Sequence, residues 1–152
     1  MIDFDGAFDK VWAALDADED ITALMMRGTK YRWLGGLLQR LEITPAMCPI
    51  LSLGPGGEFA LAYDHHEGEP TFPLMCEIAT EGQDCRTGLK LLAAVARRLR
   101  DQADSDRFDQ QDLDRVAFGA VSMDPHPGRD AANPLWVATF RVNLVFRVGT
   151  DF

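Results

Sequence analysis

Residues Leu135 to Val148 alternate between an apolar face and a more polar face. A period of two is typical of a β-strand that has one side against the core. We predict that the core face is formed by Trp136, Ala138, Phe140, Val142, Leu144, Phe146 and Val148. The opposite face then carries Val137, Thr139, Arg141, Asn143, Val145 and Arg147. A strand of this length restricts the chain to folds that are built around a β-sheet.

The predicted strand is longer than the domain that should contain it. At ~3.3 Å per residue it would extend for roughly 45 Å. A compact chain of 152 residues has a radius of gyration near ~15 Å, hence a diameter of roughly 30 Å. Part of the strand should therefore project beyond the core or bend at a β-bulge. The same length predicts a single domain over residues 1–152.

Three segments have the periodicity of amphipathic helices. The first is an N-terminal stripe that comprises Phe4, Phe8, Val11, Trp12 and Leu15. A short helix is predicted at about 19–26. The clearest helix runs from Cys85 to Gln102, with Asp84 as a possible N-cap and a cationic last turn. Its predicted inner stripe is Leu89, Leu92, Ala96 and Leu99.

The remaining elements are short strands and turns. Strands are predicted at 47–53, 58–63, 72–80 and 115–123, and Pro/Gly-rich turns and polar loops separate them. Residues 28–42 have near-helical spacing, but Gly35 and Gly36 weaken a helix there. The predicted fold class is α+β. A mixed, mainly antiparallel sheet is packed by the N-terminal helix and the long central helix, and the chain ends in an extended C-terminal β-hairpin.

Charge and composition limit the function classes. The chain has 24 acidic residues against 15 Lys plus Arg, a net charge of −9, which argues against gripping DNA phosphate. No apolar run reaches the ~18 residues of a membrane span, and the acidic start is unlike a signal peptide. Three cysteines, Cys48, Cys76 and Cys85, indicate a reducing compartment and buried free thiols.

Candidate chemical sites are weak. His65 and His66 beside Asp64 and Glu67 form the most metal-like cluster, but no second pair of ligands stands at metal-binding spacing. The three cysteines could converge with His126, yet a catalytic thiol needs a histidine that the sequence does not place beside it. We therefore predict no enzymatic activity, no metal and no cofactor.

The helix over 86–100 has a concentration of positive charge. It carries Arg86, Lys90, Arg97, Arg98 and Arg100, and the connector from Asp101 to Asp114 that follows has six Asp and one Arg. A solvated helix face is the usual meaning of such a pattern. A salt-bridged contact with an acidic neighbouring subunit is an alternative, and a phosphate-binding face is another.

The order of elements resembles that of the tail-terminator (tail-completion) proteins of long-tailed bacteriophages. An N-terminal helix precedes a strand that begins at a Cys-Pro step, over 48–54. The strand at 73–80 leads into the long helix that ends at Arg100, and a Pro/Gly loop separates the strands at 115–123 and 135–148. The resemblance covers about 45–150 and rests on pattern rather than on a signature motif.

This resemblance implies a structural virion protein. Such a protein forms a hexameric ring that caps the head-proximal end of the tail tube, ends tube polymerisation and joins the tail to the head connector. The implied partners are further copies of the chain, the tail tube protein and the head–tail connector, assembled in the host bacterial cytoplasm. DNA would pass through the ring without specific binding, because an acidic lumen repels phosphate.

We expect the loops at 58–72 and 124–134 to contact neighbours in such an assembly. The candidate interface residues are His65, His66, Glu67, His126, Arg129, Arg141 and Arg147. Two other functions remain open on the sequence. One is a head–tail connector or baseplate component of the same particle, and the other is an unrelated α/β domain that binds a small ligand.

Overall fold

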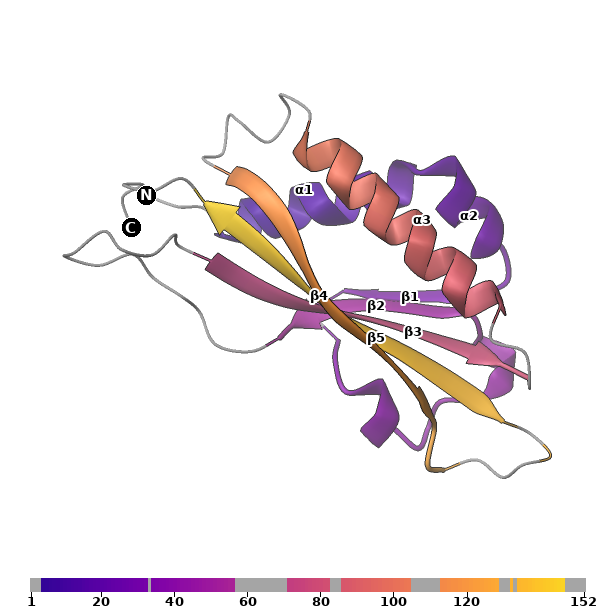
Figure 1. Ribbon diagram of the computed structural model, residues 1–152. Helices are drawn as coiled ribbons and strands as arrows, with labels where there is room; N and C mark the ends of the chain where they lie inside the picture. Colours follow the sequence, from indigo (N-terminus) through magenta and orange to yellow (C-terminus); the bar gives the residue numbers. More distant parts are fainter. Residues whose placement is uncertain are drawn as a thin grey trace.

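The computed structural model describes residues 4–32, 34–56, 71–82, 86–104, 113–128, 132 and 134–146. One five-stranded sheet, in the order β1-β2-β3-β5-β4, has three helices on one face and two short 3-10 helices on the other (Figure 1). The β1–β2 pair is parallel and the other pairs are antiparallel. This arrangement confirms the α+β prediction. The elements are α1 (Phe4–Ala17), α2 (Glu19–Leu24), β1 (Thr29–Arg32), η1 (Leu37–Gln39), η2 (Pro45–Met47), β2 (Ile50–Pro55), β3 (Thr71–Glu81), α3 (Arg86–Ala103), β4 (Leu113–Pro125) and β5 (Leu135–Phe146).

The main core lies between the helices and the sheet. The predicted stripe of α1 is buried there from Phe8 to Leu15, with Phe8 and Val11 fully excluded from solvent, and Phe4 is partly buried against it. The predicted core face of β5 is also buried from Ala138 to Phe146. Burying one large apolar side chain stabilises a fold by about 1.5–3 kcal/mol, so these two elements contribute much of the folding free energy.

The central helix buries a different stripe from the one predicted. Leu91, Val95 and Leu99 face the sheet, whereas Leu89 is 49% exposed. The cause is a close approach between α3 and β3. A Cβ atom at Gly88 would lie 3.1 Å from the Thr80 hydroxyl oxygen, so the helix turns its glycine toward the strand. The predicted stripe is therefore wrong except at Leu99 and at the partly buried Leu92.

Residues 28–42 do not form an α-helix, although their apolar spacing is near-helical. Thr29–Arg32 is a strand, and Gly36 takes a left-handed φ of 71° before the 3-10 helix η1. The buried Glu77 on β3 fixes this geometry. Its two carboxylate oxygens accept hydrogen bonds from the backbone N–H groups of Gly36 and Leu37, each at 2.8 Å.

A smaller second core covers part of the opposite face of the sheet. It joins the segment 34–48 to the strands and comprises Leu37, Ile43, Cys48, Ile50, Ala79, Leu135 and Val137. Gly54 permits the close packing, because a Cβ atom there would lie 2.5 Å from the Leu34 carbonyl oxygen. Val137 is therefore buried although it lies on the more polar face of β5, whereas Arg141 on that face is exposed.

The boundaries of several strands differ from the sequence expectation. The strand predicted at 47–53 begins at Ile50, after η2 and a cis Cys48–Pro49 peptide bond. The strand predicted at 58–63 and the last two residues of the strand predicted at 135–148 lie outside the described residues. The expected bend or bulge in the strand at 135–148 is not found over its described residues, because β5 pairs with β3 in unbroken register from Leu135 to Val145, and the bulge lies in β4 instead. Phe118 pairs with Val142 but Val121 pairs with Phe140, so β4 contains one extra residue between them.

Candidate assembly surface

Strand β4 forms one edge of the sheet. It pairs with β5 on its inner side, and no strand among the described residues pairs with its outer side. Figure 1 shows β4 (orange) against β5 (yellow), which it crosses in this view of the twisted sheet. A long edge strand presents unpaired backbone N–H and C=O groups, which are suited to pairing with another chain.

Two apolar side chains on β4 are partly exposed to solvent along this edge. Phe118 is 38% exposed and Val121 is 49% exposed. Both pair with β5 residues whose side chains face the helices, and the Phe118 ring centroid lies 6.4 Å from that of Phe140. The margin of the main core is thus open to solvent at β4. Backbone hydrogen-bonding groups and apolar area occur together there, as in many protein interfaces.

The bulge lies within this edge. A hollow of about 250 Å³ is lined there by residues that include Met75, Gly119, Ser122 and Arg141. A Cβ atom at Gly119 would lie 3.2 Å from the Cβ atom of Arg141, so the bulged backbone packs tightly against β5. Bulges increase the local twist of an edge strand and change the direction in which its side chains point.

The structure places two of the predicted interface residues. Arg141 is exposed on the sheet face away from the helices, beside the bulge. His126 is buried: its Nε2 atom lies 3.1 Å from the Leu37 carbonyl oxygen and 3.0 Å from that of Arg40. Gly128 N–H donates to its Nδ1 atom, so the ring tethers the end of β4 to η1 and is not part of the surface.

The other predicted interface residues lie outside the described parts of the chain. They are His65, His66, Glu67, Arg129 and Arg147. Phe118 and Val121 were not among the predicted interface residues. Their apolar character in a predicted strand was visible, but the sequence alone did not show that this strand lies at an edge.

The cysteines are arranged for packing. Cys76 lies in the main core and Cys48 in the second core, on opposite faces of the sheet, and neither forms a disulfide. Burial, and then the neighbouring Glu77 charge, raises the pKa of the Cys76 thiol far above its usual range. A thiol held neutral in this way is a poor nucleophile. Cys85 lies outside the described residues.

Among the described residues, side chains that could ligate a metal are dispersed, and the helices are short or polar. No group of three or more His, Cys, Asp or Glu side chains within these residues is arranged to hold a metal ion. Each of their helices is too short or too polar to cross a membrane.

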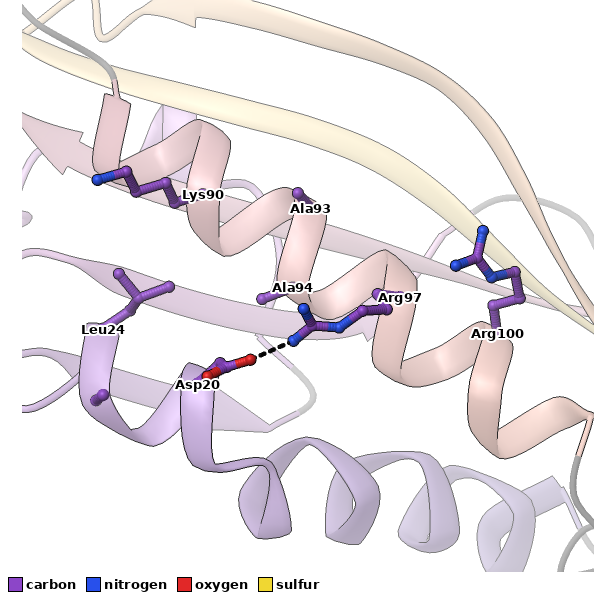
Figure 2. A pocket seen from close by; sticks show the side chains of 8 residues that line it. Asp20, Leu24, Lys90, Ala93, Ala94, Arg97 and Arg100 are labelled. Atoms are coloured by element: carbon purple, nitrogen blue, oxygen red, sulfur yellow. Dashed lines mark hydrogen bonds and ion pairs between the residues drawn. The ribbon is translucent and has the colours of Figure 1, made fainter.

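A second surface feature is a groove between α2 and α3, with a volume of about 580 Å³. Figure 2 shows Asp20 and Leu24 on α2 and the cations Lys90, Arg97 and Arg100 along α3. Arg97 reaches across to Asp20, with 2.5 Å between nitrogen and carboxylate oxygen. The sequence showed the cations of α3 but not the packing of α2 against them.

No family model matches the chain, and no curated protein matches it. Solved structures do match. One is a chain from a structure titled "Virion of native gene transfer agent (GTA) particle". The two chains share 19% sequence identity, and the match covers 89% of this chain and 91% of the other with a TM-score of 0.55. The likeness extends over nearly the whole of both chains and establishes a shared fold.

Proposed function

We propose that this chain is a structural subunit of a phage-like particle and acts as a tail terminator. In this role, copies of the chain form a hexameric ring at the head-proximal end of the tail tube. The ring ends tube polymerisation and joins the tail to the head connector. The observation that carries the proposal is the fold likeness to a gene transfer agent virion chain over 89% of this chain. The order of elements, which resembles that of tail terminators, supports it independently.

In this proposal, a neighbouring copy of the chain contacts the outer edge of β4. A closed ring needs two different surfaces on each subunit, one for each neighbour. Pairing with the outer side of β4 would satisfy its free backbone groups and cover Phe118 and Val121 together. Such a contact depends on the shapes of the two edges and on their hydrogen bonds, and it requires no catalytic residue. The net charge of −9 per subunit suits a ring through which DNA passes without binding.

We expect Val121→Lys to break the ring. Val121 is 49% exposed, so the monomer should tolerate the change. In the ring, a charged side chain at this edge opposes pairing and removes the apolar contact. A loss of about 2 kcal/mol per contact corresponds to roughly 30-fold weaker association. Native mass spectrometry of both proteins at the same concentration measures the effect.

The matched control is Ser122→Lys. Ser122 is the next residue on β4, is also exposed, and points to the other face of the sheet. This change leaves the apolar contact of Phe118 and Val121 in place, so it should weaken association less than Val121→Lys does. The proposed contact is contradicted if Val121→Lys assembles as the wild type does, or if both variants lose assembly to the same extent.

A further inference from the structure

The groove between α2 and α3 has an apolar floor and a cationic rim. Leu24 and Ala94 contribute to its floor, and Lys90, Arg97 and Arg100 line its rim, where Figure 2 shows the Arg100 guanidinium pointing away from α2. At about 580 Å³ it is large enough to accept an aromatic side chain together with its flanking backbone.

The rim is positive in a chain that is otherwise acidic. Among the described residues, Asp20 is the one acidic residue that lines the groove, and it is paired with Arg97. Lys90 and Arg100 have no ion pair within the described residues, and both are exposed. Two cations therefore remain available to a ligand, while the whole chain carries −9.

We propose that this groove binds the acidic segment 104–112 of a neighbouring copy of the chain. This inference rests on the proposed ring. The segment reads DSDRFDQQD, with four Asp, one Arg and a single aromatic residue at its centre. Phe108 matches the apolar floor, and Asp106 and Asp109 on either side of it match the cationic rim. Charge complementarity of this kind orients protein partners and accelerates their association.

The length of the segment favours binding to the groove of a neighbouring copy over binding to the groove of its own chain. Lys90 lies 14 positions before Asp104, which is about 21 Å along the helix. Strand β4 begins at the end of the molecule at which α3 finishes (Figure 1). To cover the groove of its own chain, the segment would have to extend from Asp104 to Lys90 and return to the start of β4, a path of roughly 42 Å. The nine steps from Asp104 to Leu113 span at most ~30 Å. A neighbour's segment is free of this limit.

A charge-swap experiment tests the inference. The groove variant is Lys90→Glu with Arg100→Glu, and the segment variant is Asp106→Lys with Asp109→Lys. Each alone places like charges together, so each should raise the dissociation constant of the assembly at least tenfold at low salt. In an equimolar mixture that alternates, the acidic groove of one variant meets the basic segment of the other at every second contact, and the unchanged basic groove meets the unchanged acidic segment at the contacts between. The mixture should therefore assemble as the wild type does, with alternating copies identified by labelling one variant with ¹⁵N.

The control for charge alone is Arg27→Glu with Lys30→Glu, a reversal of the same size on residues outside the groove. It should leave the dissociation constant within about threefold of the wild type, because neither residue lines the groove. The ion pair that is lost, between Lys30 and Asp16, is largely exposed and contributes little. The inference is overturned if the groove variant behaves like this control, or if the mixture stays dissociated although each variant alone is weakened. Neither result would contradict the proposed ring of the wild-type protein. A monomeric wild type would overturn the proposed ring together with the inference.

Discussion

We expect the replacement of Phe140 with aspartate to unfold the protein. Phe140 is 2% exposed in the main core, where it pairs with Cys76 on β3 and Val121 on β4. The substitution loses an aromatic side chain, which alone costs about 3–5 kcal/mol, and adds the cost of burying a carboxylate. Small domains are stable by only about 5–15 kcal/mol in total. Circular dichroism should show no cooperative thermal transition for the purified variant.

The control lies one residue further along the strand. Arg141 is exposed on the opposite face of β5, so Arg141→Asp should fold and melt within a few degrees of the wild type. A shift of one residue in strand register exchanges the two faces. Equal behaviour of the two variants would therefore contradict the assignment of the faces of β5.

Glu77→Ala should lower the free energy of unfolding by about 3 kcal/mol or more. The buried carboxylate of Glu77 accepts one hydrogen bond from Gly36 N–H and one from Leu37 N–H. A hydrogen bond to a charged group contributes about 1.5–3 kcal/mol, and unpaired buried donors add a further penalty. Urea unfolding measures the total, and amide hydrogen exchange at Gly36 and Leu37 reports whether the segment 34–48 has detached.

Glu77→Gln provides a graded comparison. The amide keeps one acceptor oxygen and replaces the other with a donor, so roughly half of the loss is expected. An alanine variant as stable as the wild type would show that Glu77 does not hold this segment on the sheet.

The sequence predicted correctly those features that follow from residues close together in the chain. The alternation at 135–148 identified the core face of β5, but the length argument placed a bend or bulge in that strand, whereas the extra residue lies in β4 between Phe118 and Val121. The near-helical spacing at 28–42 was misleading because the conformation there depends on Glu77, about 40 residues away in sequence. The stripe of α3 was misplaced for the same kind of reason, since the Gly88–Thr80 contact joins two separate elements.

The candidate surfaces were harder to predict than the fold. A strand at 115–123 follows from the sequence, but its position at the edge of the sheet depends on strand order. His126 was expected in an interface because it lies in a Pro/Gly loop. The backbone carbonyl groups of Leu37 and Arg40 instead hold it in the interior. The cations of α3 were evident, but the groove that they border exists only because α2 packs against α3.

The most direct test of the central claim is the length distribution of tails in a particle-producing strain from which the gene for this chain has been deleted. A tail terminator limits tube growth, so electron microscopy should show tubes that extend well beyond the wild-type length and carry no heads. Supplying the wild-type gene in trans should restore both uniform length and attached heads. Tails of normal length that merely lack heads would contradict the terminator role and indicate a connector instead.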